Sequence, residues 1–450
     1  MSAILDLAAQ VRSGAVSAVS LAERTLADIA RADIGLNAVT RLLPERALKE
    51  AAEVDAMVAA GRDPGPLAGV PYGVKDLFDV RGLATTAGST LYAGAPPATR
   101  DAEAVARLRS AGAVLVATLN MDAFAYGFAT INAHHGTTLN PHDPARLAGG
   151  SSGGSAALVA AGLVPFSLGS DTNGSIRVPA SLTGTFGLKP THGDLPMDGV
   201  FPFAASFDDI SPFANSTADL HAVWEVLAAR VVEPRRREFR VARLGGRFRQ
   251  NIDPDQLAAI DAIAPTAPLL DLPDVARARS AAFIITAYEG GALHRERLAR
   301  EAMAFDPAVR DRLLAGALLP KRLYLEAQAF RRAYEARIAA LVAEFDVLLA
   351  PATPCAAPLV EDPRILIDGA LSPARADLGI HTQPISFLRL PALSVPLHRP
   401  GRLPLGLQLI GRAHREADVF AFAAQLEAQG VIGWSQPRDT GQATQQGAMA

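Results

Sequence analysis

The N-terminal sixty residues place apolar and polar side chains at the spacing of an α-helix. Apolar side chains recur at Ile4, Ala8 and Val11. Residues three and four positions apart share one face of a helix, so this spacing predicts amphipathic helices. The same periodicity continues over 37–62, and the apolar positions on that predicted face are Leu42, Leu43, Ala47, Leu48 and Ala51. We therefore expect residues 1–62 to form a helical N-terminal region.

After residue 62 the pattern changes to short apolar runs that are separated by turn-forming residues. Residues 65–76 are rich in glycine and proline, and their end predicts a short buried strand. A helix is expected over 102–110, followed by a buried strand over 113–118. Strands that alternate with helices in this way are typical of an α/β sheet.

Small residues dominate positions 149–190, where a short helix and two strands are expected. The predicted elements there are a helix at 155–163 and strands at 165–168 and 185–188. From Ser216 to residue 345 the pattern is mainly helical, with one strand at 239–244. The C-terminal region predicts strands at 347–350, 392–395 and 405–410, and a closing helix at 416–429.

Apolar elements recur along the chain without an intervening linker, which favours a single domain over residues 1–440. Within it we expect the helical N-terminal region over 1–62, a core over 65–215, a mainly helical insert over 216–345, and a C-terminal sheet and helix over 346–440. A flexible tail is expected over 441–450.

Composition narrows the class of protein. The 43 basic and 46 acidic residues nearly balance, whereas a nucleic-acid-binding protein needs a strongly basic surface. One cysteine, Cys355, excludes an intrachain disulfide and a multi-cysteine zinc site. The chain has no run of about 18 apolar residues and no visible secretory leader, so we expect a cytoplasmic protein that is not inserted in a membrane.

Arginine far outnumbers lysine, and one of the four lysines has a distinctive setting. Lys75 follows the apolar segment GVPYGV. Burial disfavours the charged ammonium form and lowers the pKa of a lysine, whereas arginine stays protonated. A second basic feature is the arginine cluster at Arg235–Arg249, which is interpreted either as a solvated connector or as a site for an acidic partner.

The sequence contains serines in glycine-rich loops, and two mechanisms could use them. Residues 149–153 match GxSxG, the nucleophile elbow of α/β-hydrolases, but a loop precedes them where that elbow needs a strand. The alternative is a serine hydrolase with a lysine base. A desolvated Lys75 accepts a proton, a second serine relays it, and a glycine-bearing turn such as 171–175 supplies N–H groups for the oxyanion. Neither a metal nor an organic cofactor is needed by this chemistry.

Several long motifs, in order, resemble the amidase signature family. They are GVPYGVKD (69–76), GGSSGGS (149–155), GSDTNGSIRVPA (169–180), GLKPT (187–191), PALSVP (391–396) and LPLGLQLIG (403–411). The resemblance implies an α/β fold with a large central mixed β-sheet flanked by helices on both faces.

The resemblance also implies a Ser–cis-Ser–Lys triad. The family's lysine corresponds to Lys75, its bridging serine in a cis peptide to Ser151, and its nucleophile to Ser175. The backbone groups that it implies for the oxyanion are those of Thr172, Asn173, Gly174 and Ser175.

Two positions depart from the family pattern. Asn173 stands where a second glycine is common, and its side chain offers a further contact to substrate. Ala123 stands where a glutamate is common, so no role of that acid is carried over. Asp171 and Arg177 flank the expected nucleophile with opposite charges, and we interpret them as a structural ion pair.

Within the family the chain is most similar to the branch that contains the 1-carboxybiuret hydrolases. That branch implies release of ammonia from a small urea-like or carboxylated amide, and a small helical accessory subunit in a homo- or hetero-oligomer. The expected substrate contacts are Tyr126, Phe128, Asn132 and Gln383. Two alternatives stay open: the A subunit of a tRNA-dependent amidotransferase, which hydrolyses glutamine, and a catalytically silent scaffold subunit.

Overall fold

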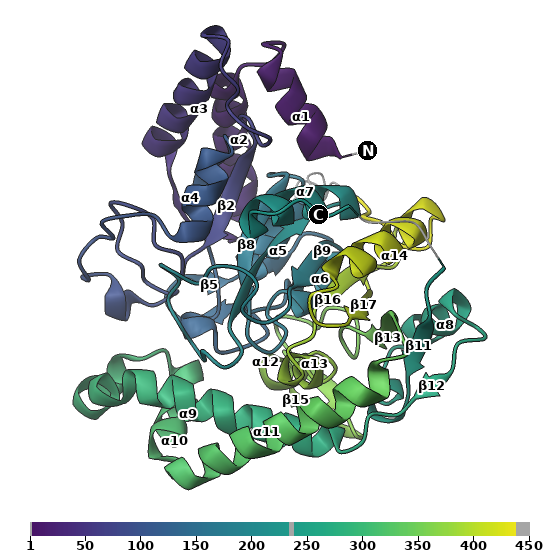
Figure 1. Cartoon of the computed structure of the whole chain (residues 1–450). Helices are drawn as coiled ribbons and strands as arrows, with labels where there is room; N and C mark the ends of the chain where they lie inside the picture. Colours follow the sequence, from purple (N-terminus) through teal and green to yellow (C-terminus); the bar gives the residue numbers. More distant parts are fainter. Residues whose placement is uncertain (1, 234–237, 438–450) are drawn as a thin grey trace, which may run out of the picture.

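A large mixed β-sheet runs through the centre of the molecule (Figure 1). The computed structural model describes residues 2–233 and 238–437, and within them this sheet has eleven strands. In spatial order the strands are β1 (Val39–Leu42), β3 (Val114–Leu119), β2 (Pro71–Lys75), β8 (Phe166–Asp171), β10 (Asp209–Ala214), β9 (Phe186–Lys189), β16 (Ala392–Pro396), β17 (Gly406–Gly411), β13 (Val347–Pro351), β11 (Val241–Leu244) and β12 (Leu269–Leu270).

Parallel pairing occurs near both ends of the sheet, antiparallel pairing occurs in its middle, and the edge strand β1 pairs antiparallel with β3. Strand β2 runs parallel to β3 and β8, and β11 runs parallel to β12 and β13. Strands β8, β10, β9, β16, β17 and β13 pair antiparallel in that order. Three short ladders lie outside this sheet: β4 (Ile131–Asn132) with β5 (Gly136–Thr137), β6 (Leu139–Asn140) with β7 (Asp143–Leu147), and β14 (Arg364–Ile367) with β15 (Ala370–Pro373).

Helices flank the sheet on both faces, which confirms the predicted α/β class with a large mixed sheet. The helices are α1 (Ala3–Arg12), α2 (Ala18–Ala32), α3 (Pro44–Ala59), α4 (Glu103–Ser110), α5 (Gly153–Ala160), α6 (Arg177–Thr183), α7 (Thr217–Ala228), α8 (Pro254–Ile263), α9 (Val275–Glu301), α10 (Pro307–Leu318), α11 (Lys321–Val342), α12 (Ala374–Asp377), α13 (Gln383–Phe387) and α14 (Glu416–Ala428). Figure 1 shows α1, α2 and α3 at one end of the molecule and the helices α9, α10 and α11 at the other.

The central strands are continuous apolar runs because the sheet is covered on both faces. All residues of β3 and β8 are buried. One cluster of buried apolar side chains extends from Ile4 in α1 to Ile432 after α14. The sheet is therefore a rigid support for the loops that follow its strands.

The N-terminal helix prediction is wrong over residues 39–42, which form strand β1. Val39 pairs with Leu119 at the antiparallel edge of the sheet. Helix α3 begins only at Pro44, where the fixed φ of proline suits a first helical position. Pairing with an existing strand outweighs the helical spacing of the apolar residues here, because it satisfies backbone hydrogen bonds that the sheet edge would otherwise leave open.

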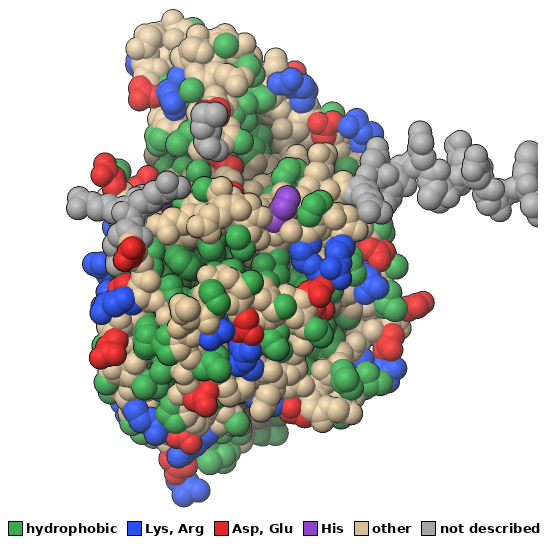
Figure 2. Space-filling view, turned by 90° about the vertical axis from the view of Figure 1, so that its right-hand side faces the viewer, with side chains coloured by type: hydrophobic (Ala, Val, Ile, Leu, Met, Phe, Trp, Pro, Cys, Tyr) green, Lys and Arg blue, Asp and Glu red, His purple; other side chains and the backbone are tan. Residues whose placement is uncertain are grey.

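Charged side chains of both signs are interspersed on the face shown in Figure 2. The arginines of the 235–249 cluster that the structure describes pair within the chain, with N–O distances of 3.1 Å or less. The pairs are Arg240 with Asp346, Arg243 and Arg249 with Asp261, and Arg247 with Asp368. Residues 235–237 of this cluster, and the tail 441–450, lie outside the described residues.

The described helices include none that is long and apolar enough to cross a membrane.

Candidate active site

Lys75 is the last residue of β2, and its side chain is fully buried. Its Nζ lies 2.7 Å from Ser151 Oγ and 2.8 Å from Ser170 Oγ. Strand β2 runs parallel to β8, with Val74 opposite Leu168, so the ends of both strands reach the same edge of the sheet. Among the residues that the structure describes, no carboxylate forms an ion pair with Lys75. The amine therefore faces two hydroxyl groups.

The environment of Lys75 favours its neutral form. Burial lowers the pKa of this amine from 10.5 to about 7, although the carboxylates of Asp122, Asp171 and Asp208 act in the opposite direction. An ammonium in a buried site loses its hydration. This loss destabilises the charged form more than attraction to the three carboxylates stabilises it. An uncharged amine beside a hydroxyl can accept that hydroxyl's proton, which is what a general base must do.

Ser151 lies in a glycine-rich turn that precedes α5. The Gly150–Ser151 peptide bond is cis, as the family resemblance implies. The turn packs tightly, because a Cβ atom at Gly150 would stand 2.4 Å from Asp122 Oδ2 and 2.5 Å from the Ala129 nitrogen. The glycines therefore allow a close backbone approach. Asp122 in turn accepts hydrogen bonds from the N–H groups of Ala129 and Thr130.

Ser175 lies in the loop between β8 and α6, five positions after Ser170. Asp171 organises this loop: its Oδ1 accepts a hydrogen bond of 2.7 Å from the Gly174 N–H, and its Oδ2 accepts one from the Ile176 N–H. A Cβ at Gly174, where φ is +135°, would stand 2.0 Å from Thr382 Oγ1. The loop thus requires glycine at the position before Ser175.

The predicted ion pair between Asp171 and Arg177 is confirmed. Arg177 Nη2 lies 2.9 Å from Asp171 Oδ1, and both side chains are fully buried. Burial alone would raise the pKa of Asp171, but the charge and hydrogen bonds of Arg177 bring it below its ordinary value. Arg177 also donates to Gln408 and to the carbonyl of Thr382. The pair anchors the Ser175 loop to the C-terminal region of the chain.

One of the four predicted oxyanion donors is already engaged. The Gly174 N–H donates to Asp171, so this group points into the loop's own hydrogen-bond network. The backbone N–H groups of Thr172, Asn173 and Ser175 have no acceptor among the described residues. The prediction is therefore corrected to three candidate donors, and Gly174 supports the loop.

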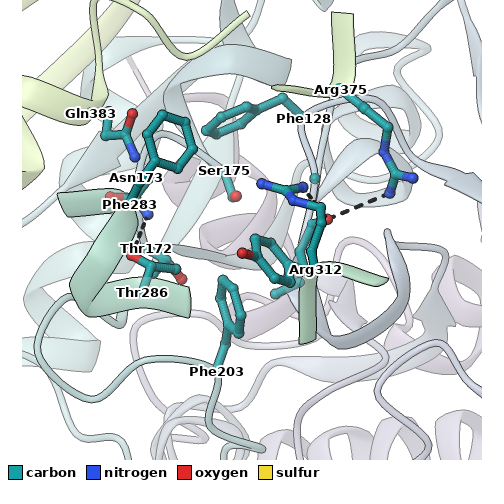
Figure 3. A pocket seen from close by; sticks show the side chains of 13 residues that line it. Phe128, Thr172, Asn173, Ser175, Phe203, Phe283, Thr286, Arg312, Arg375 and Gln383 are labelled. Carbon is teal, nitrogen blue, oxygen red and sulfur yellow. Dashed lines mark hydrogen bonds between the residues drawn. The ribbon is translucent and has the colours of Figure 1, made fainter. Parts of the chain in front are cut away.

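Ser175 lines a small pocket. The side chains around it come from loops near the sheet edge and from helices α9, α10, α12 and α13 (Figure 3). The lining residues are Ala125, Tyr126, Gly127, Phe128, Thr172, Asn173, Ser175, Phe203, Phe283, Thr286, Arg312, Arg375 and Gln383. Three of the expected substrate contacts, Tyr126, Phe128 and Gln383, thus line the same pocket as Ser175.

Asn132 does not line this pocket, and its expected contact with substrate is corrected. Its Nδ2 donates to the carbonyls of Gly88 and Met121. Its Oδ1 accepts from the N–H groups of His134 and His135. With both ends of the amide engaged, Asn132 ties backbone segments together.

Sequence reasoning missed two arginines of the pocket. The guanidinium of Arg312 lies over the ring of Tyr126, with Cζ 3.8 Å from the ring centre, and its Nη1 donates to the Tyr126 carbonyl. Arg375 donates to the same carbonyl and lies 3.9 Å from Asp122 Oδ1. Among the described residues Arg312 forms no ion pair, so its charge is open to an anionic ligand. Neither arginine lies in one of the motifs that resemble the family.

Within the described residues, no group of three or more His, Cys, Asp or Glu side chains is placed to hold a metal ion.

The chain belongs to the amidase family, whose sequence pattern it matches over residues 20–242 and 267–420. The resemblance inferred from the motifs is thereby confirmed.

Two relatives are similar to the chain over 94% and 91% of its length. The chain is 44% identical over 444 residues to AtzE, a component of the 1-carboxybiuret hydrolase of Pseudomonas sp. (strain ADP), with 94% of this chain and 97% of the relative covered. It is 35% identical over 460 residues to the A subunit of the glutamyl-tRNA(Gln) amidotransferase of Chloroflexus aurantiacus (strain ATCC 29366 / DSM 635 / J-10-fl), with 91% and 92% covered.

Solved structures also resemble nearly the whole chain. One, described as a vestigial protein complex that reveals the evolutionary origins of an s-triazine catabolic enzyme, has a TM-score of 0.92 and 42% identity, and covers 96% of this chain and 99% of that one. A peptide amidase in complex with the competitive inhibitor chymostatin has a TM-score of 0.82 and 28% identity, with 97% and 98% covered.

Proposed function

We propose that the protein is an amidohydrolase that releases ammonia from a small, linear, carboxylated amide of the urea type. The observation that carries the proposal is the buried Lys75 amine, which faces Ser151 and Ser170 without an ion pair among the described residues. The 44% identity to a component of a 1-carboxybiuret hydrolase supports the substrate class.

The reaction uses the three predicted catalytic residues. Neutral Lys75 takes the proton of Ser151, and Ser151 takes the proton of Ser175. The Ser175 oxygen attacks the amide carbon, and the backbone N–H groups of Thr172, Asn173 and Ser175 bind the oxyanion. The protons return along the same relay to the leaving nitrogen, which departs as ammonia. Water then attacks the acyl-enzyme, so that one amide and one water become one acid and ammonia.

The two arginines support recognition of a carboxylate. A guanidinium pairs well with a carboxylate because its N–H groups match the two oxygens. Arg312 has no carboxylate partner among the described residues, and it shares the pocket with Ser175. Burial lowers the pKa of Arg312, but arginine remains a cation at neutral pH. We assign the substrate carboxylate to Arg312 and Arg375, with Tyr126, Phe128 and Gln383 as further contacts.

We also propose that the chain assembles with a small helical accessory subunit. The support is that the solved structure with a TM-score of 0.92 is described as a protein complex. Size-exclusion chromatography with light scattering, on the chain expressed with and without its neighbouring reading frames, tests this assembly.

Ammonia release over a panel of ureido and carboxamide compounds tests the activity. We expect ureidoacetate and related carboxylated ureas to be hydrolysed without the partner subunits of an amidotransferase and without tRNA. Ser175→Ala should abolish this activity, and Ser280→Ala, a change at an exposed serine on α9, should leave it intact. Undiminished release by Ser175→Ala would contradict the mechanism.

Two further results would favour the alternatives. Glutamine hydrolysis that depends on partner subunits and charged tRNA would identify one component of an amidotransferase. Failure of a serine-directed fluorophosphonate to label Ser175, together with no ammonia release from any compound, would identify a silent scaffold.

A further inference from the structure

The pocket contains buried amide groups whose polar atoms lack partners. Asn173 is 7% exposed and Gln383 is 1% exposed. Asn173 Oδ1 and both Gln383 Oε1 and Nε2 form no hydrogen bond with the described residues. Buried polar atoms are nearly always hydrogen-bonded, so unpaired ones that line a pocket are available to a ligand.

Thr286 orients one of these amides. It lies on α9 and is 1% exposed, and its Oγ1 accepts a hydrogen bond of 3.0 Å from Asn173 Nδ2. This bond engages the donor end of the Asn173 amide and leaves the acceptor end, Oδ1, for the pocket. The helical insert thereby fixes a group on the loop that carries Ser175.

The pocket has a cationic side and an amide side. In Figure 3, Arg312 and Arg375 lie on one side of Ser175, and Asn173, Gln383 and Thr286 lie on the other. A linear substrate with its carboxylate at the arginines and its carbonyl carbon at Ser175 extends its terminal amino group towards the amide side. An amino group offers N–H donors, and Asn173 Oδ1 is an unpaired acceptor.

We propose that Asn173 Oδ1, held in place by Thr286, accepts an N–H of the substrate's terminal amino group, and that this contact selects primary amides. The inference rests on the proposed function, because it places the amide carbon at Ser175. Asn173 is then a specificity residue and Thr286 a positioning residue. Gln383 Oε1 is placed to accept the second N–H of the same group.

The test compares two ligands that differ at one group. Ureidoacetate ends in an amino group, and N-acetylglycine carries a methyl group in its place. Dissociation constants are measured by calorimetry in a Ser175→Ala background, which prevents turnover. A hydrogen bond between neutral groups predicts that ureidoacetate binds about tenfold more tightly than N-acetylglycine.

Two substitutions at position 286 separate orientation from packing. Thr286→Val keeps the shape but removes the acceptor for Asn173 Nδ2, so the preference for ureidoacetate should fall to about one. Thr286→Ser keeps the hydroxyl and should retain the preference. Asn173→Ala provides a second route to the same loss if Thr286→Val does not fold. A merely structural role of Thr286 would weaken both ligands equally.

Three results would overturn the inference: equal affinity for the two ligands in the background, no binding of either, or an unchanged preference in Thr286→Val and Asn173→Ala. Ammonia release from ureidoacetate with Ser175 intact is measured separately. If ammonia is released from ureidoacetate but ureidoacetate does not bind more tightly than N-acetylglycine, only this inference is refuted. If ureidoacetate binds more tightly but no ammonia is released, only the proposed activity is refuted.

Discussion

The pH dependence of the reaction should report the ionisation of Lys75. With a pKa of about 7, half of the buried amine is neutral at pH 7. A free lysine with a pKa of about 10.4 would be neutral in only about 1 molecule in 2,500 at that pH. Burial therefore increases the population of the competent base by about a thousandfold.

The direction of the pH dependence follows from the fact that only the neutral form of Lys75 can act as the base. Protons at low pH convert Lys75 to the ammonium form, which cannot accept the proton of Ser151. We expect kcat/KM to rise about tenfold per pH unit below about pH 6 and to level off above about pH 8. Lys75→Arg should lose at least about a thousandfold in kcat/KM although it keeps the positive charge, because arginine does not deprotonate near neutrality.

Ammonia release is measured with a fixed-time assay from about pH 5 to about pH 9, since kcat/KM reports ionisations of the free enzyme. Circular dichroism at each pH establishes that the protein stays folded. A profile that is flat over this range, or an active Lys75→Arg variant, would refute the assignment of Lys75 as the base.

Three further substitutions test the site and its support. Arg312→Gln should reduce kcat/KM for ureidoacetate by about 10- to 100-fold, because a charged hydrogen bond is lost; an equal loss for its uncharged amide would argue against carboxylate recognition. Arg177→Met should lower the free energy of unfolding by about 3–5 kcal/mol in urea titrations, because it leaves Asp171 buried and unpaired; a change below about 1 kcal/mol would contradict the anchoring role. Gly174→Ala should abolish ammonia release, because its Cβ would collide with Thr382; normal activity would show that the loop needs no glycine.

The sequence was most informative where the site is encoded by local motifs. Lys75, Ser151 and Ser175 each lie in a segment whose glycines and neighbours form a recognisable pattern. The predicted Asp171–Arg177 pair is confirmed, and its two residues are only six positions apart. Local backbone geometry determines how the residues within each motif are placed, and such local geometry requires particular residues at fixed spacings in the sequence.

The far wall of the pocket could not be predicted in the same way. Thr286 and Arg312 lie on α9 and α10, more than a hundred residues after Ser175 and outside the motifs that resemble the family. Only the folding of the chain, in which α9 packs on α10, α11 and α13, brings them to the nucleophile. Asn132 shows the converse error. It lies in the loop that the family resemblance places beside the nucleophile, but its side chain is engaged by hydrogen bonds to backbone groups.

Strand β10 escaped prediction for a related reason. Asp209, Ser211 and Pro212 interrupt its apolar pattern. The strand nevertheless pairs with β8 along its whole length, with Asp209 opposite Asp171. Asp209 is also paired with Lys189 at 3.0 Å, so its charge is compensated by a residue that only the folded chain brings close.

Acylation of Ser175 through the Lys75 relay is the step on which the proposed mechanism depends. It is observed most directly by mass spectrometry of the protein after acid quenching during turnover of ureidoacetate, followed by peptide mapping. We predict an added acyl group on the peptide that contains Ser175, and no such group in Ser175→Ala or Lys75→Arg. Ammonia release without any adduct on Ser175, or an adduct on Ser151 in its place, would contradict the mechanism.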